Sequence, residues 1–199
     1  MDSQLSVVIL AAGLGTRMKS KLAKVLHRAG GASLVGHVVR AARSIAPPER
    51  IAVVVGHQAE SVQAELASQG VAFADQGKPL GTGHALKVAR EAAGAASRVV
   101  VLYGDCPLLA PATLTRLVEE HTRSPRAATV ITTNLADPTG YGRIVRDAAG
   151  NVLAIVEQKA ATEEQKRITE INSGIYCFEA AALWPALASV TPNPASGEY

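Results

Sequence analysis

The chain has 199 residues, of which 48% are hydrophobic and 19% charged, so it has the composition of a globular protein that can bury a substantial core. No apolar run approaches the ~20 residues that span a bilayer, and the start lacks the basic segment of a signal peptide, which argues against membrane insertion and secretion. The net charge is +3, but residues 1–50 hold eight Lys or Arg against two acidic residues, which predicts an anionic ligand for this part of the chain.

Strands and helices are predicted to alternate through the first two thirds of the chain. Residues 5–10 form a run that is apolar except for Ser6 and is followed by Gly13 and Gly15, as expected of a strand buried on both faces. Ser33 is a predicted N-cap for a helix over residues 34–45, which Pro47 and Pro48 end. Further strands are predicted at residues 51–55, 71–74, 98–102 and 128–133, and further helices at 59–68, 82–95 and 113–122.

This order predicts an α/β fold with a doubly wound, mostly parallel sheet of Rossmann-like type. The rhythm changes after Asn134, where residues 144–145 and 152–156 are separated by Ala149-Gly150-Asn151 and predict a hairpin. A strand at 174–178 and a helix at 180–187 follow. We therefore expect an antiparallel appendage on the parallel sheet.

The segment from Leu10 to Met18 reads Leu-Ala-Ala-Gly-Leu-Gly-Thr-Arg-Met and follows the first strand directly. Glycines at the carboxyl end of a parallel strand let backbone N–H groups approach an anion. A dinucleotide fingerprint would need glycine where Met18 stands, and a P-loop would need Gly-Lys-Ser/Thr. Arg17 and Lys24 add two cations close to this loop, which suits a polyphosphate.

These residues resemble the signature of sugar-nucleotide pyrophosphorylases, in which A-A-G-x-G-T-R-M is followed by P-K. The string from Asp137 to Ile144, Asp-Pro-Thr-Gly-Tyr-Gly-Arg-Ile, is most similar to the bacterial N-acetylglucosamine-1-phosphate uridylyltransferases, and the resemblance runs from residue 5 to residue 199. It implies a nucleotide-diphospho-sugar transferase fold whose appendage binds the sugar. It also implies transfer of uridylyl from UTP to N-acetylglucosamine 1-phosphate, with release of pyrophosphate, in peptidoglycan and lipopolysaccharide biosynthesis.

The resemblance also implies site residues. Arg17 and Lys24 would be catalytic cations on the phosphates, and His84 is given no catalytic role. The nucleotide would lie on Leu10, Ala11, Ala12, Gly13, Gln76, Gly81 and Thr82, where the Gln76 amide can donate to a uracil carbonyl and accept from its N3–H. The sugar would contact Tyr103, Gly104, Gly140, Glu157 and Asn172.

Asp105 follows the apolar strand at 98–102 and is the expected Mg²⁺ ligand, because a lone carboxylate beside phosphates is best accommodated by a hard cation. A structural capping role for Asp105 is the alternative. Because a sugar 1-phosphate is already an anion, attack on UTP needs placement and cations rather than a general base.

Three positions depart from the family pattern: Ala23 stands for the proline before the lysine, Ala32-Ser33 for a basic residue and proline, and Ala160 for an aspartate. The missing proline could loosen the segment that aims Lys24. Ala23→Pro should therefore stabilise the chain, provided that its φ is already near −65° and its N–H is unbonded.

We expect no nucleic-acid partner, because only 4% of residues are aromatic and no basic run of five occurs. Cys106 and Cys177 form no C-x-x-C pair, which indicates a reducing cytoplasm and thiols packed as small hydrophobic groups. Residues 1–199 are expected to be one nucleotidyltransferase domain that is truncated at its C-terminal end. The family's downstream asparagine ligand and its acetyltransferase β-helix would be absent, so this part would be monomeric whereas the full-length parent forms trimers.

Two other functions remain open from the sequence. One is a nucleotidyltransferase for another sugar or for a cytidylyl acceptor. The other is a non-catalytic sensor of a nucleotide sugar on the same fold.

Overall fold

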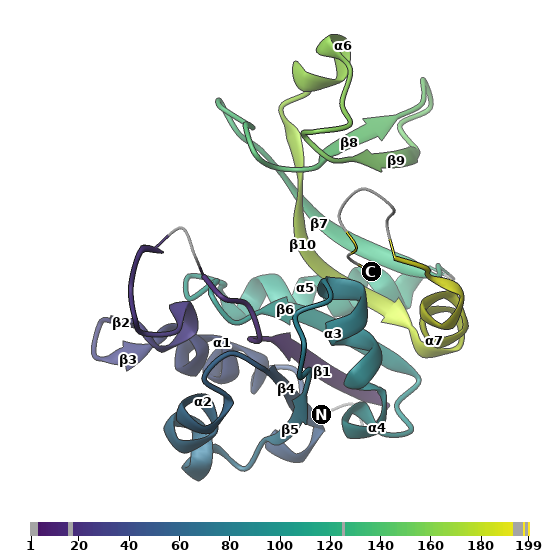
Figure 1. The fold of residues 1–199 in the computed structure, drawn as a ribbon. Coiled ribbons are helices and arrows are strands. Elements are labelled where there is room, and N and C mark those ends of the chain that lie inside the picture. The colour runs from purple at the N-terminus through teal and green to yellow at the C-terminus, as the bar shows by residue number, and fades with distance from the viewer. Residues whose placement is uncertain (1–3, 16–17, 125, 193–196, 198) are drawn as a thin grey trace. The chain divides into compact units, whose positions relative to one another are not determined.

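The computed structural model describes residues 4–15, 18–124, 126–192, 197 and 199. The chain forms two compact units (Figure 1). The first comprises residues 1–129 and 177–199, and the second comprises residues 130–176. The positions of the two units relative to each other are not determined.

Four parallel strands form the centre of the first unit, in the order β5-β4-β1-β6. They are β1 (Leu5–Leu10), β4 (Ile51–Val55), β5 (Ala72–Asp75) and β6 (Arg98–Tyr103). Val7 of β1 pairs with Ile51 on one side and with Val100 on the other. The side chains of β1 and β4 are almost all buried, as expected of parallel strands that are covered on both faces. The predicted central strand is thus confirmed.

Helices connect these strands through right-handed crossovers. Because the path from β1 to β5 moves in one direction across the sheet and the return to β6 in the other, the first two crossover helices cover one face and the next two cover the opposite face. The helices are α1 (Leu34–Ala42), α2 (Ala59–Leu66), α3 (Thr82–Val88), α4 (Arg90–Ala93), α5 (Pro111–Arg123) and α7 (Ala180–Ser189). Among them, α1 packs against α5 and α3 packs against α7. The doubly wound architecture is confirmed.

A two-stranded hairpin and three 3-10 helices complete the described part of the first unit. The hairpin pairs β2 (Arg28–Ala29) with β3 (Ala32–Ser33), and the two glycines between them have φ of 56° and 85°. Ser33 caps α1 as predicted, because its hydroxyl accepts from the Gly36 N–H at 3.1 Å. The 3-10 helices are η2 (Lys24–Leu26), η3 (Pro48–Arg50) and η4 (Ala67–Gln69).

The second unit is antiparallel, as predicted. Strand β8 (Arg143–Arg146) pairs with β9 (Val152–Val156), and the Asp147 carboxylate accepts from backbone N–H groups in the turn between them. Strands β7 (Ala128–Asn134) and β10 (Glu170–Glu179) carry the chain between the two units, and β10 pairs with β7 and β8. The short helix α6 (Glu163–Lys166) was not predicted.

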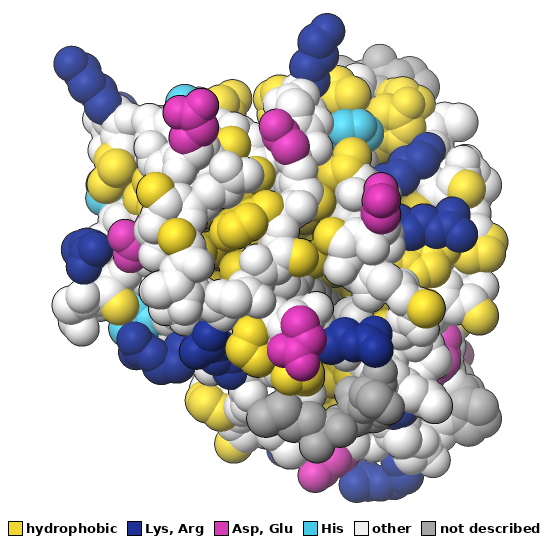
Figure 2. Space-filling view, turned by 90° about the horizontal axis from the view of Figure 1, so that it is seen from below, with side chains coloured by type: hydrophobic (Ala, Val, Ile, Leu, Met, Phe, Trp, Pro, Cys, Tyr) yellow, Lys and Arg dark blue, Asp and Glu magenta, His cyan; other side chains and the backbone are white. Residues whose placement is uncertain are grey.

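The surface carries both signs of charge. On the face shown in Figure 2, basic and acidic side chains are interspersed among hydrophobic and uncharged ones. Within the described residues, no helix has the length and apolar character that crossing a bilayer requires.

Candidate active site

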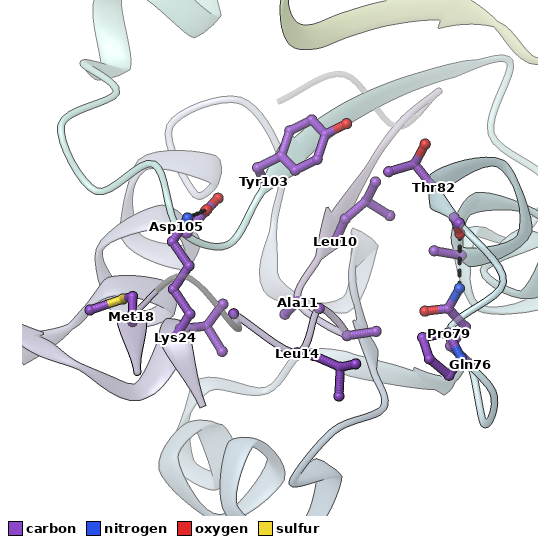
Figure 3. Close-up of a pocket in the computed structure, with 16 residues that line it drawn as sticks. Leu10, Ala11, Leu14, Met18, Lys24, Gln76, Pro79, Thr82, Tyr103 and Asp105 are labelled. Atoms are coloured by element: carbon purple, nitrogen blue, oxygen red, sulfur yellow. Dashed lines mark hydrogen bonds and ion pairs between the residues drawn. The ribbon is translucent and has the colours of Figure 1, made fainter. Parts of the chain in front are cut away.

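A pocket of about 530 Å³ opens at the carboxyl ends of β1 and β6 in the first unit (Figure 3). The pocket thus lies at the carboxyl ends of neighbouring parallel strands, the edge where open α/β sheets bind ligands. Ten predicted site residues line it: Leu10, Ala11, Ala12, Gly13, Lys24, Gln76, Gly81, Thr82, Tyr103 and Asp105. Gly104 follows Tyr103, and its N–H donates to the Leu10 carbonyl at 2.9 Å.

The loop after β1 is held against its neighbours by backbone contacts. The Ala11 N–H donates to the Val54 carbonyl at 2.9 Å, which extends the β1–β4 pairing by one residue. Gly15 has φ of 61°, and a Cβ at this position would lie 2.7 Å from the Lys24 Cβ. Only glycine therefore allows the loop to approach the Lys24 backbone so closely. The predicted catalytic residue Arg17 lies outside the described residues.

Lys24 and Asp105 form an ion pair on one side of the pocket (Figure 3). The lysine begins η2, and the aspartate follows β6 by two residues. Their side chains are 40% and 26% exposed, so both can reach a ligand in the pocket. Whereas the sequence suggested a lone carboxylate, the structure gives Asp105 a cationic partner before any ligand binds.

Cys177 is buried, as the sequence predicted, whereas Cys106 is only partly buried. Burial, helped by the charge of Asp105, raises the pKa of the Cys106 thiol to about 11, and burial raises the pKa of Cys177 to about 12. Both thiols are free and remain protonated near neutral pH. Although Cys106 adjoins Asp105, it is not an activated nucleophile.

Gln76 forms the opposite side of the pocket, where its side chain is largely buried. Its Nε2 donates to the Gly81 carbonyl at 2.9 Å and lies 3.4 Å from the His84 Nδ1. These contacts engage the amide N–H groups and leave the carbonyl oxygen as the acceptor toward a ligand. Two hydrogen bonds to uracil were expected for this amide, one accepted and one donated. The structure supports the accepted bond, whereas the Nε2 that would donate the other already bonds to the Gly81 carbonyl.

The remaining predicted sugar residues, Gly140, Glu157 and Asn172, belong to the second unit. The Asn172 N–H donates to the Gly142 carbonyl at 2.9 Å, and a Cβ on Gly142 would lie 2.9 Å from the Glu157 Oε1. The Gly140 N–H donates to the Gln158 Oε1 at 3.4 Å. The loop between β7 and β8 thus brings these three residues together within their own unit.

Sequence reasoning missed two residues of this cluster. The Tyr176 hydroxyl donates to the Asn172 Oδ1 at 2.8 Å, and burial together with the nearby Glu157 charge raises the pKa of Tyr176. Arg143, which is 1% exposed, donates to the Gln158 Oε1 at 2.7 Å. Tyr176 lies four residues after Asn172 on β10, so alternation along the strand could have placed both on one face.

Comparisons with known proteins show the family of the chain. Residues 7–172 match the model of the MobA-like NTP transferase domain family. Three curated relatives, each named bifunctional protein GlmU, are 50% identical to this chain in Solibacter usitatus, 51% in Pseudomonas entomophila and 47% in Clostridioides difficile. The alignments cover 100%, 98% and 96% of this chain but 43%, 42% and 41% of the relatives. The chain therefore spans about two fifths of the length of these relatives.

Solved structures agree on the fold. A Bacillus anthracis protein assigned as a glucose-1-phosphate thymidylyltransferase matches with a TM-score of 0.78 at 24% identity, over 98% of this chain and 78% of that one. HddC from Yersinia pseudotuberculosis matches with a TM-score of 0.71 at 24% identity, over 98% and 81%.

The family match covers most of the chain, including the loop after β1, the Lys24–Asp105 pair and Gln76. The relatives also confirm the resemblance that the motifs indicated. The chain belongs to the family of MobA-like NTP transferase domains and is a nucleotidyltransferase.

Proposed function

We propose that this chain transfers uridylyl from UTP to N-acetylglucosamine 1-phosphate, giving UDP-N-acetylglucosamine for cell-wall precursors and releasing pyrophosphate. The observation that carries the proposal is the shared pocket, in which the Lys24–Asp105 pair and the Gln76 carboxamide lie on opposite sides of the loop after β1 (Figure 3). Such a pocket offers charge at one end for phosphates and a hydrogen-bonding edge at the other for a base.

The residues suit phosphoryl transfer without a general base. The attacking oxygen of a sugar 1-phosphate already carries charge, so the site must place it and relieve repulsion between anions. Among the described residues that line the pocket there is no histidine, and Lys24 is the basic one. In our proposal Lys24 and Arg17 offset charge on the triphosphate and on the departing pyrophosphate.

The residues that line the pocket fit Mg²⁺ that binds together with a nucleotide. Within the described residues, no group of three or more His, Cys, Asp and Glu side chains could hold a metal ion. Mg²⁺ commonly binds through one or two carboxylates together with waters and substrate phosphates, and Asp105 supplies one carboxylate. When bound, the cation would neutralise phosphate charge.

Gln76 supports a preference for uracil. Its carbonyl oxygen can accept from the N3–H of uracil, whereas the N3 of cytosine is itself an acceptor. An unpaired buried polar group costs about 1–3 kcal/mol. UTP should therefore be preferred to CTP by roughly 5- to 150-fold, which is the ratio that this free energy gives.

The side chains of the second unit support the proposal that the sugar carries an N-acetyl group. The Oδ1 of Asn172 accepts from Gly174 N–H at 2.9 Å and from Tyr176, which leaves its amide N–H groups to donate to a carbonyl such as that of the acetyl group. The Glu157 carboxylate can accept from sugar hydroxyls. We propose that these residues and Gly140 contact the sugar. The sugar contacts predicted for Tyr103 and Gly104, which belong to the first unit, stay predictions.

We also propose that residues 1–199 are the transferase part of a longer parent, as the relatives' lengths and their printed name suggest. The acetyltransferase β-helix, the trimer, the cytoplasmic location and the lack of nucleic-acid and membrane partners stay predictions.

The test is an assay of the initial rate of pyrophosphate release. The chain is incubated with Mg²⁺, with each of UTP, CTP, ATP and GTP, and with N-acetylglucosamine 1-phosphate, glucose 1-phosphate or mannose 1-phosphate. We expect the highest rate with UTP and the N-acetylated sugar. Equal rates with all four nucleotides would refute the assignment of Gln76. Binding of UDP-N-acetylglucosamine without release of pyrophosphate would instead favour a sensor.

A further inference from the structure

Gln58 has an unusual backbone conformation. It stands at the N-cap of α2 with φ of 54° and ψ of 41°, in the left-handed region. Lys19 is the other non-glycine residue with positive φ in the described part of the chain. This region is unfavourable for residues with a Cβ, so a glutamine held there needs a compensating contact. Its side chain makes no capping hydrogen bond to α2.

The Gln58 side chain instead forms hydrogen bonds to the backbone of residues 21–23, which directly precede Lys24 in the sequence. Its Oε1 accepts from the Ala23 N–H at 2.9 Å, and its Nε2 donates to the Lys21 carbonyl at 2.6 Å. The carboxamide thus bridges two backbone groups that lie 37 and 35 residues away in the sequence. Ala23 is only 1% exposed, so water cannot readily replace this partner for its N–H.

The backbone that Gln58 holds continues directly into Lys24. The Ala23 carbonyl accepts from the Leu26 N–H at 2.9 Å and so starts η2, in which Lys24 is the first residue. Gly15 closes the other side of the Lys24 backbone, where there is no room for a Cβ. Lys24 is therefore held between the loop after β1 and the Gln58 side chain, with its amine on Asp105.

We infer that Gln58 is a positioning residue, which acts through Ala23 to fix the backbone that aims the Lys24 amine into the pocket. The inference rests on the proposed function of Lys24 as a phosphate-contacting cation. The left-handed backbone of Gln58 is the conformation that turns its side chain toward residues 21–23.

The conformation of Ala23 makes the inference testable by rescue. Ala23 has φ of −53° and ψ of 137°, so its φ lies in the range that a proline ring enforces by itself. The N–H is bonded, however, so the condition set for a stabilising Ala23→Pro substitution is not met, and no stabilisation is expected in the unsubstituted chain. A proline Cδ would meet the Gln58 Oε1. Once the Gln58 side chain is removed, the same proline has room and can take over its role.

The experiment compares five forms of the 199-residue chain: unsubstituted, Gln58→Gly, Ala23→Pro, Gln58→Gly with Ala23→Pro, and Lys19→Gly as the control for glycine at a positive φ. Glycine tolerates the Gln58 backbone, so Gln58→Gly removes the side chain while relieving strain. For each form, kcat and KM for UTP, the Tm and the hydrogen exchange of residue 23 (or its neighbours in the proline variants) are measured.

Gln58→Gly should lower kcat by roughly 10- to 100-fold, as small misplacement of a catalytic group does, with little change in Tm. Exchange of the Ala23 N–H should accelerate in this variant. Ala23→Pro alone should lower the Tm, whereas the double variant should recover most of the lost kcat, and Lys19→Gly should match the unsubstituted chain.

An unchanged kcat or unchanged exchange in Gln58→Gly would overturn the inference, as would a double variant no more active than Gln58→Gly. If the unsubstituted chain transfers no uridylyl group, the proposed function fails instead. In that case the exchange of Ala23 still decides whether Gln58 fixes this backbone.

Discussion

The two glycines of the loop after β1 should respond very differently to the same substitution. Gly15→Ala adds a Cβ 2.7 Å from the Lys24 Cβ at φ of 61°. The left-handed backbone costs about 1–2 kcal/mol for a residue with a side chain, and overpacking adds about 1–3 kcal/mol. We expect a loss of roughly 2–5 kcal/mol in the free energy of unfolding, together with lower kcat, because the cheapest relief moves Lys24.

Gly13→Ala is the matched control, because a Cβ at Gly13 meets nothing within 4 Å and its φ is not positive. Its free energy of unfolding should stay within ~0.5 kcal/mol of the unsubstituted chain. Urea denaturation of the three forms measures the difference, and pyrophosphate release measures kcat. If Gly15→Ala is no more destabilising than Gly13→Ala, our account of how the loop packs on Lys24 is incorrect.

Three further outcomes follow from the described contacts. Lys24→Ala should lower kcat by ~10²-fold or more but hardly change Tm, because its ion pair is partly exposed; a melting shift of many degrees at unchanged kcat would contradict this. Burial lowers the pKa of His121, although the nearby charge of Glu179 opposes this shift. Below pH ~6.5 the unfolded chain therefore binds a proton that the folded chain does not, so the free energy of unfolding decreases as the pH is lowered. His121→Gln should flatten this acid limb in denaturation curves from pH 8 to 5, and an unchanged slope would assign it to other groups. Calorimetry should find Mg²⁺ bound roughly 5- to 150-fold more weakly without UTP than with it, and equal affinities would show a preformed metal site.

The parallel sheet was predictable because its signal is local. The apolar run at residues 5–10 and the alternation of strands and helices require only hydrophobic period and turn residues, and β1 has the predicted bounds. Its order also placed Asp105 beside the loop after β1, since the carboxyl ends of parallel strands share one edge. Two short elements carried signals that we overlooked: Gly30-Gly31 between β2 and β3, and the capping box of Thr162 and Gln165 in α6.

The part that sequence could not supply consists of contacts between distant segments. Nothing near Ala23 indicates that its N–H is bonded to a side chain 35 residues away. The φ condition for a stabilising proline is therefore met, whereas the condition of an unbonded N–H is not. Likewise, the donors of Gln76 are committed by the Gly81 carbonyl and His84, which fixes the direction of its acceptor. Residue types indicated which groups could act, whereas tertiary contacts decided which of their atoms remain available.

The pairing of Lys24 with Asp105 predicts that Mg²⁺ and nucleotide bind together. Without ligand, the lysine amine neutralises the carboxylate, and a cation that bound there alone would displace the amine and leave it unpaired. A single carboxylate offers Mg²⁺ little compensation, because the ion prefers several oxygen ligands. A triphosphate removes both disadvantages. Its oxygens complete the ligand set of the ion, and they accept hydrogen bonds from the Lys24 amine that the ion displaces. Each of the two ligands therefore removes the penalty that opposes the other, which by linkage makes their binding mutually favourable.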